Sequence, residues 1–168
     1  MPRRAACATA SASSRASTSP AAASCPASAG GEAPRGCTPA ELAAGFSARL
    51  MWRAAGEGEL YLYAPDRAAR CGDSIGRGAF RLPAGTWAEL AQEVVLNTPG
   101  RADGRIRLWL DGRPVLDRGG LLLRETAAVR VDGLLFASFF GGSDPSWASP
   151  RDQSAEFSGF ELWEAAAR

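Results

Sequence analysis

Two neighbouring segments of the chain alternate apolar and polar residues, which is the pattern of half-buried β-strands. In residues 46–53 the apolar positions share one face, namely Phe46, Ala48, Leu50 and Trp52. Residues 59–63 alternate in the same way after a Gly56-Glu57-Gly58 turn. The pattern predicts an antiparallel hairpin, and we expect Arg53 to lie opposite Tyr61 and Met51 opposite Tyr63.

The polar face of this hairpin gathers the residues with the most useful chemistry. It carries Ser47, Arg49, Arg53, Tyr61 and Tyr63, whereas Leu60 and Leu62 stay on the core side. Two guanidinium groups beside two phenols form a surface suited to binding a carboxylated sugar and to moving a proton.

Short strand-like runs continue along the chain between Gly, Pro and Asp turn signals. They cover residues 78–82, 86–96, 105–110, 114–116, 129–140 and 156–163, and the apolar run 129–140 indicates a strand buried on both sides. Helical signals are confined to residues 39–44 and to the tail from Glu164. The pattern predicts an all-β fold, a jelly-roll or concanavalin-like β-sandwich of antiparallel sheets.

Residues 105–116 read as a second hairpin around an Asp111-Gly112 turn. Arg105, Arg107 and Trp109 face away from the predicted core, and with Arg53 they are our candidate substrate-binding residues. The alternative is a solvated outer face with one covering tryptophan, which this strand taken alone favours.

At 168 residues the chain suits a single domain, which we place at residues 35–164 before a short tail, 165–168. Residues 1–34 are rich in Ala and Ser, and we expect a disordered or transit-like segment there; a misassigned start of the gene is the alternative. Cys37 and Cys71 bracket the first hairpin and form either a disulfide or two free buried thiols.

Composition excludes several classes of chemistry. All 19 basic residues are Arg, 18 residues are acidic, and the chain has neither Lys nor His. No Ser-His-acid or Cys-His site can form, no carboxylate cluster has metal-ligand spacing, and we expect no metal and no cofactor. The balanced charge argues against nucleic acid, and no apolar run is long enough to span a membrane.

The ordered motifs resemble polysaccharide lyase family 14, the alginate and glucuronan lyases. The resemblance begins at Ser47-Ala-Arg49 and Tyr61-Leu-Tyr63. It continues through Cys71-Gly72, Gly76-Arg-Gly78, Leu96-Asn-Thr-Pro-Gly100, Asp111-Gly112, Phe139-Phe-Gly-Gly142, Asp144-Pro-Ser-Trp147, Arg151-Asp-Gln153 and Phe157-Ser-Gly-Phe160. It implies a β-jelly roll with its active site on the concave sheet.

The resemblance also implies a reaction, the β-elimination of a uronate polymer. By carry-over, Tyr61 or Tyr63 transfers protons, Arg49 neutralises the uronate carboxylate, and Ser47 orients the sugar. Which tyrosine is base and which is acid stays open.

One family feature is missing, because the family pattern has a catalytic Lys upstream of the Ser-x-Arg strand. Residues 24–37 show no strand pattern there and contain only Arg35 as a cation. Either an arginine substitutes, or the N-terminal part of the jelly roll is lost or misassigned. We therefore expect weak or absent catalysis.

Three functional hypotheses remain. The first is a polyuronate lyase acting on alginate or glucuronan, the second is a non-catalytic carbohydrate-binding module, and the third is a purely structural β-sandwich. In the first two the partner is an anionic polysaccharide, and we expect a monomer. The resemblance implies an extracellular location, whereas the N-terminal composition suits organelle targeting.

Overall fold

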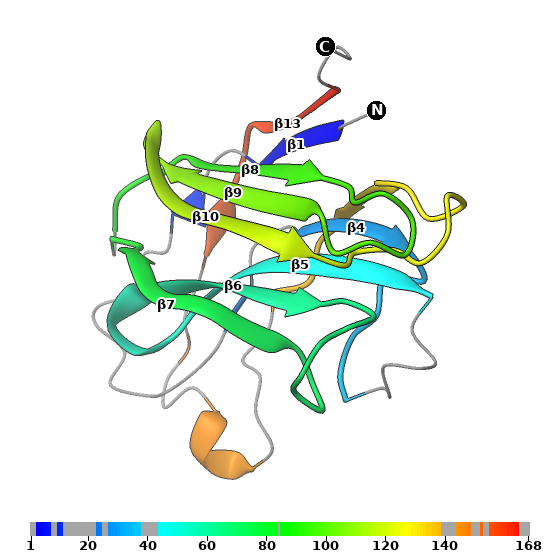
Figure 1. Cartoon of the computed structure of the whole chain (residues 1–168). Helices are drawn as coiled ribbons and strands as arrows, with labels where there is room; N and C mark the ends of the chain where they lie inside the picture. Colours follow the sequence, from blue (N-terminus) through cyan, green and yellow to red (C-terminus); the bar gives the residue numbers. More distant parts are fainter. Residues whose placement is uncertain are drawn as a thin grey trace.

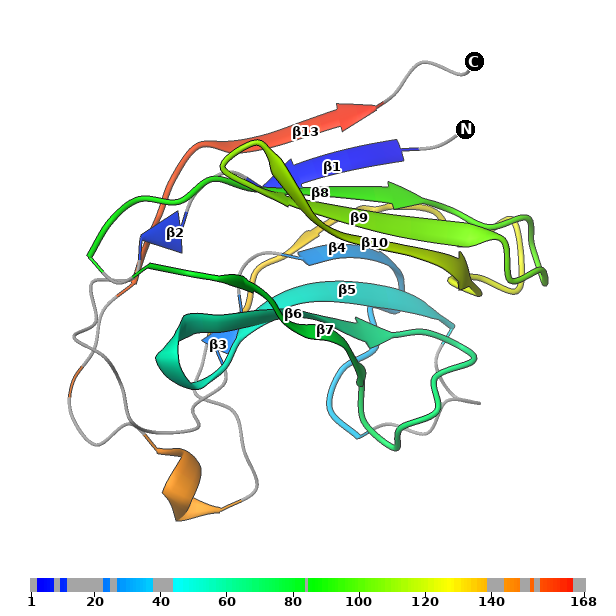
Figure 2. The same ribbon diagram turned by 60° about the vertical axis from the view of Figure 1, so that its left-hand side comes forward.

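Two antiparallel sheets lie face to face in this computed structural model (Figures 1 and 2). The structure describes residues 3–7, 10–11, 23–24, 27–37, 44–83, 85–138, 144–148, 152 and 155–164. The first sheet has the order β10-β9-β8-β1-β13. Its strands are β1 (Arg3–Cys7), β8 (Leu90–Val95), β9 (Gly104–Leu110), β10 (Arg113–Leu121) and β13 (Phe160–Glu164).

The second sheet has six strands and holds the hairpin of interest. Its order is β11-β4-β5-β6-β7, with β3 also paired to β5. The strands are β3 (Ala23–Ser24), β4 (Ala27–Gly31), β5 (Gly45–Trp52), β6 (Glu57–Tyr63), β7 (Asp73–Arg81) and β11 (Gly133–Leu135). A separate pair joins β2 (Ala10–Ser11) to β12 (Glu156–Phe157), and the 3-10 turns are η2 (Ala54–Gly56) and η3 (Pro145–Trp147).

The predicted all-β sandwich of antiparallel sheets is confirmed. Alternate residues of the facing strands meet in one apolar core between the sheets. β5 and β6 contribute Phe46, Ala48, Leu50, Leu60 and Leu62; β8, β9 and β10 contribute Leu90, Val94, Ile106, Leu108 and Leu121. In the described residues the outward faces of the two sheets therefore lie on opposite sides of the sandwich.

A buried glutamine links the two sheets through the core. Gln92 on β8 is 3% exposed, and its amide reaches the pair of strands opposite. Its Nε2 donates to the Ala48 carbonyl at 3.1 Å, and its Oε1 accepts from the Ser28 amide at 3.1 Å. Because both backbone groups are buried, the side chain satisfies hydrogen bonds that would otherwise be lost there.

The β5–β6 hairpin forms, but its predicted register is wrong. Tyr61 lies opposite Arg49 rather than Arg53, and Tyr63 lies opposite Ser47 rather than Met51. The shift is four residues, because residues 53–56 form the connection and place Glu57 and Gly58 in β6. An even shift leaves every side chain on its predicted face.

The second hairpin is close to its prediction. β9 and β10 are joined by Asp111 and Gly112, which have φ of 49° and 72°. Positive φ at both central residues is typical of the type I′ turn, which suits the twist of a two-residue hairpin. β10 extends further than predicted, to Leu121, through two irregularities in its pairing.

The expectation that residues 24–37 lack a strand is wrong. Ala27–Gly31 forms β4, which pairs with β5 and with β11. The predicted domain boundary at residue 35 stays a prediction. The predicted helix 39–44 also lies outside the described residues, apart from Ala44, and the tail prediction fails at Glu164, which ends β13.

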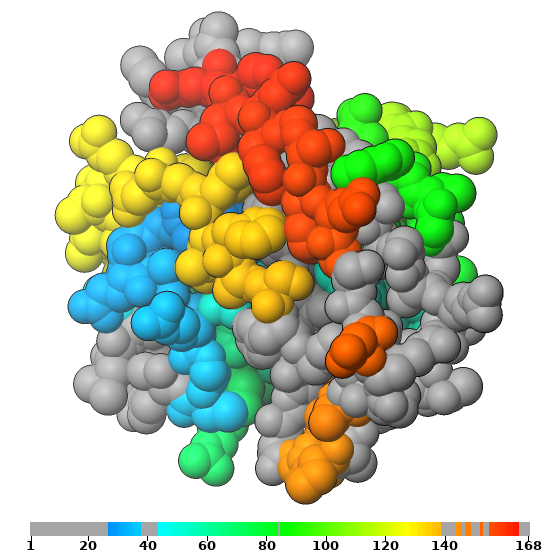
Figure 3. Space-filling view, turned by 180° about the vertical axis from the view of Figure 1, so that it is seen from behind, coloured from blue at the N-terminus to red at the C-terminus, as the bar shows by residue number. Residues whose placement is uncertain are grey.

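The predicted doubly buried strand 129–140 is also wrong. Of its described residues, 129–138, only Gly133–Leu135 forms a strand, at the edge of its sheet, and Phe136 is 52% exposed. The Phe136 ring contacts Phe157 and Phe160 edge to face, with centroids 5.0 and 5.8 Å apart. Figure 3 shows this part of the chain beside β13 on the surface. None of the helices among the described residues could cross a membrane.

We expect Gln92→Leu to lower the free energy of unfolding by about 2–4 kcal/mol, because two buried backbone groups lose their partners. Urea unfolding would measure the change. The control is Glu125→Leu at an exposed position, where we expect little effect. Equal changes in the two variants would show that the Gln92 bridge contributes nothing.

Candidate active site

The outward face of β5 and β6 collects the polar residues of the hairpin. Ser47 and Arg49 come from β5, and Tyr61 and Tyr63 come from β6. Their alternation with core residues forces them to one side, and the register pairs Ser47 with Tyr63 and Arg49 with Tyr61. The structure therefore brings together the four residues that the resemblance assigns to catalysis.

Arg49 is a buried cation with unused hydrogen-bonding capacity. Only 6% of the residue is exposed, and its Nε donates to Ser47 Oγ at 3.4 Å. Among the described residues its Nη2 atom is buried and makes no hydrogen bond. Burial is the main cause that lowers the pKa of Arg49. A carboxylate would supply both the missing acceptor and the missing counter-charge.

The two tyrosine rings stand edge to face, with centroids 5.5 Å apart and planes at 80°. Tyr63 is buried, and the Arg49 Cζ lies 5.1 Å from its ring centroid. A second guanidinium, that of Arg67, lies 5.8 Å from the same centroid. Burial raises the pKa of Tyr63, and the neighbouring Tyr61 adds to this, whereas Arg49 opposes it.

A buried carboxylate completes the face, and the sequence analysis did not single it out. Glu59 is fully buried on β6, two positions before Tyr61. Arg53 donates to its Oε1 from Nε at 2.7 Å and lies 2.5 Å away through Nη2; Ser74 Oγ donates to Oε2 at 2.5 Å. The Arg53 Cζ lies 5.6 Å from the Tyr61 ring centroid. Glu59 therefore orients the guanidinium beside Tyr61.

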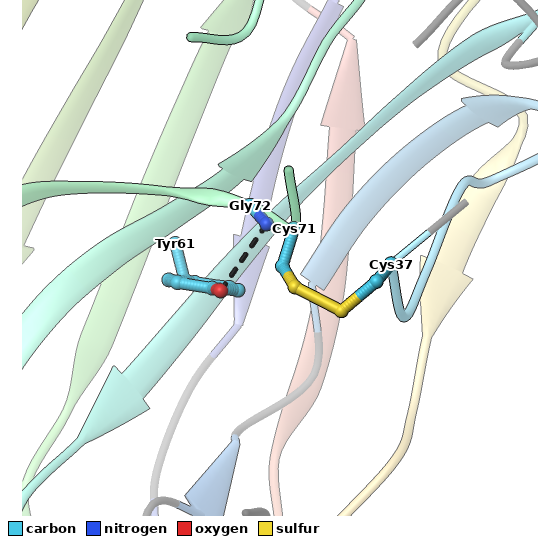
Figure 4. Close-up of a disulfide and its surroundings, with 4 residues drawn as sticks. All are labelled: Cys37, Tyr61, Cys71 and Gly72. Atoms are coloured by element: carbon cyan, nitrogen blue, oxygen red, sulfur yellow. Dashed lines mark hydrogen bonds between the residues drawn. A yellow bond between two sulfur atoms is a disulfide. The ribbon is translucent and has the colours of Figure 1, made fainter. Parts of the chain in front are cut away.

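Two loop segments flank this face and are joined by a disulfide between Cys37 and Cys71 (Figure 4). On one side, the Pro34 carbonyl accepts a hydrogen bond from Ser47 Oγ at 2.6 Å. On the other side, the Gly72 amide donates to Tyr61 Oη at 3.2 Å. Ser47 and Tyr63 are buried, whereas Tyr61 is partly exposed, so the face is most accessible near Tyr61.

The remaining predicted binding residues do not join this face. Arg105, Arg107 and Trp109 lie on β9, in the other sheet, with Ile106 and Leu108 pointing into the core between them. Arg105 pairs with Asp117 at 2.5 Å and Arg107 with Glu93 at 2.7 Å. They occupy the opposite side of the sandwich from Arg49, so one sugar unit cannot contact both sets.

The described part of the chain offers no cluster of three or more His, Cys, Asp or Glu residues that could hold a metal ion. The face itself carries guanidinium, phenol, hydroxyl and carboxylate groups, which can bind an anion and transfer a proton.

Comparison with known proteins agrees with this geometry. Residues 23–160 match the family polysaccharide lyase 14. The chain is similar to the PL-14 alginate lyase from Aplysia kurodai, with 28% identity and a TM-score of 0.76 over 94% of this chain and 67% of that one. A search of curated protein sequences found no significant match.

Two further solved structures share the fold at lower identity. Alginate lyase vAL-1 from a Chlorella virus is 19% identical, with a TM-score of 0.81 over 97% of this chain and 71% of that one. A variant of alginate lyase Aly36B in complex with alginate tetrasaccharide is 22% identical, with a TM-score of 0.81 over 95% and 68%.

We expect Glu59→Gln to lower the free energy of unfolding by about 2–4 kcal/mol, because Arg53 loses its buried counter-charge. Chemical unfolding would measure the loss. The control is Asp117→Asn, which removes the partner of Arg105 on an exposed surface and should leave stability nearly unchanged. A Glu59→Gln protein as stable as the parent would contradict this account.

The raised pKa of Tyr63 predicts a loss of stability at alkaline pH. The phenol of an unfolded chain ionises near pH 10, so above that pH the unfolded state binds fewer protons than the folded state. The free energy of unfolding should then fall with rising pH until Tyr63 also ionises in the folded protein. Urea unfolding at a series of alkaline pH values would show a shallower fall in Tyr63→Phe; identical slopes would refute the assignment.

Proposed function

The chain belongs to polysaccharide lyase family 14, and on that premise we propose that the outward face of β5 and β6 binds a uronate polymer and cleaves it by β-elimination. Alginate is the leading substrate, since the similar Aplysia kurodai protein is an alginate lyase, and glucuronan is the second. The single observation that carries the proposal is the buried, incompletely bonded guanidinium of Arg49 beside two phenols.

Neutralisation of the substrate carboxylate falls to Arg49. The negative charge of the uronate carboxylate must be neutralised by a positive group of the protein before the C5 proton becomes acidic enough to remove. The fixed fork of an arginine suits this task, and Nη2 has a free donor for it. We place the polymer at the Tyr61 end of the face, because Tyr61 and Arg53 are the more exposed members.

The two phenols divide the proton transfers. Burial raises the pKa of Tyr63 and keeps its hydroxyl protonated, so we assign Tyr63 as the donor to the departing O4. Tyr61, as phenolate, accepts the C5 proton. The C5–H electron pair forms the C4=C5 double bond, the C4–O4 bond breaks, and O4 takes the proton of Tyr63. The pair thus ends with its protonation states exchanged.

A second candidate, a non-catalytic polyuronate-binding module, is favoured by the missing lysine. β4 is the strand beside β5, and its residue paired with Ser47 is Ala29, which has no ionisable group. Arg35 lies close enough to lower the pKa of Arg49 electrostatically, yet a guanidinium is a poor proton carrier. Binding would then persist without cleavage.

Ultraviolet absorbance of the unsaturated product, with alginate and polyglucuronate as substrates, tests the proposal. We expect Arg49→Ala to lower kcat/KM by about 100-fold or more and Tyr63→Phe by a similar factor. The control is Arg105→Ala on the opposite outer face, which should stay within about twofold of the parent.

Other outcomes of these assays would favour the binding module or reject both functions. Folded protein that yields no product but is retained on alginate in a salt-sensitive way, with weaker retention for Arg49→Ala, would establish the binding module. Neither product nor retention would rule out both functions. A loss in Arg105→Ala equal to that in Arg49→Ala would move the binding surface to the other sheet.

A further inference from the structure

The loop between β6 and β7 ends against the Tyr61 hydroxyl. Figure 4 shows the Gly72 amide directed at Oη, with the Cys37–Cys71 disulfide at the adjacent residue. We propose that the Gly72 amide is a positioning group for Tyr61 and that the disulfide holds this amide in place. The consequence for catalysis rests on the proposed lyase function, but the placement itself does not.

The loop is held at this end by the pairing of Asp73 with Leu62 and, through Cys71, by a covalent bond. Its own hydrogen bonds join Arg67 to Ala64, and the Ala68 and Ala69 amides to the Asp73 carboxylate. Cys71 is fixed covalently to Cys37, on a segment 34 residues away in sequence. That segment is itself bonded to the site face through the Pro34 carbonyl and Ser47. The disulfide therefore ties Gly72 to β5 as well as to β6.

The backbone of Gly72 lies so close to the Tyr61 ring that a side chain at position 72 would not fit. A Cβ at Gly72 would lie 2.5 Å from Cε1 and 2.8 Å from Cδ1 of Tyr61. Real Cβ atoms do not come so close, so either the ring or the loop must move. Gly72→Ala therefore disturbs the contact with Tyr61 directly, and this glycine is needed for close approach.

The hydrogen bond fixes the orientation of the Tyr61 side chain. The Gly72 N–H lies 3.2 Å from Oη and holds the phenol oxygen on the side of the loop. Tyr61 is also the group that takes the C5 proton in the proposed reaction, and such a transfer requires a well-oriented acceptor. Loss of the disulfide should thus let the phenol adopt other orientations and slow the proton transfer.

A measurement that needs no substrate tests the placement. We compare the hydrogen exchange of the Gly72 amide, followed by NMR, in the oxidised protein and in the same protein carrying Cys37→Ser and Cys71→Ser. Without the disulfide, this amide should exchange about tenfold faster, because its hydrogen bond to Tyr61 Oη opens more often. Unchanged or slower exchange would overturn the proposal.

The activity of variants supplies a second readout. We expect Cys37→Ser/Cys71→Ser and, separately, Gly72→Ala to lower kcat about tenfold with little change in KM, because the orientation of Tyr61 is lost and the carboxylate contact is kept. The control is Gly119→Ala on β10, where a Cβ meets open space and no loss is expected. Should the cysteine variant fail to fold, Gly72→Ala in the oxidised protein decides the matter.

The outcomes separate the two proposals. Faster exchange of the Gly72 amide without the disulfide, in a protein that cleaves no polyuronate, would uphold the placement and reject the lyase function. Cleavage that becomes faster without the disulfide would overturn the placement, since the joined segments would then act as an obstruction. Equal losses in Gly119→Ala and Gly72→Ala would also contradict it.

Discussion

The pairing of β5 with β6 is the constraint on which the rest of the site depends. Period-two alternation sends Phe46, Leu50 and Leu60 into the core and, in the same step, sends Arg49 and Tyr61 to the outer face. Any one-residue slip would exchange the two sets and place guanidinium groups in the core, which is energetically prohibitive. Burial of the apolar residues thus fixes the β5–β6 register, and the register in turn fixes which side chains reach the outer face.

The two arginines of the outer face differ in how their charge is compensated. Arg53 forms an ion pair with the buried Glu59, whereas the Nη2 atom of the buried Arg49 has no hydrogen-bond acceptor among the described residues. A buried cation of this kind is most stable when an anion reaches it. The difference between these two arginines is therefore the difference between a structural ion pair and a binding group, although both sit on the same hairpin.

The sequence predicted the sandwich and the composition of the β5–β6 face because both depend on parity, which an even error in register leaves intact. It missed β4, whose residues are all Ala, Ser or Gly. A Cβ at Gly30 would lie 1.8 Å from the Arg130 carbonyl oxygen and 2.7 Å from the Phe46 ring, so close packing requires small residues that give no strand signal. Glu59 was missed because an isolated Glu usually indicates solvent, and the sequence alone could not tell which outer face would hold Arg105.

The irregular strands at two sheet edges bear on how the protein behaves at high concentration. β7 borders its sheet with Gly76 and Gly78 at positive φ and with the exposed Arg77 and Arg81, and β10 borders the other with Pro114. Bends, charges and a missing amide donor all hinder the addition of a strand from another molecule. These two borders are thus poor templates for intermolecular β-pairing and fibril growth.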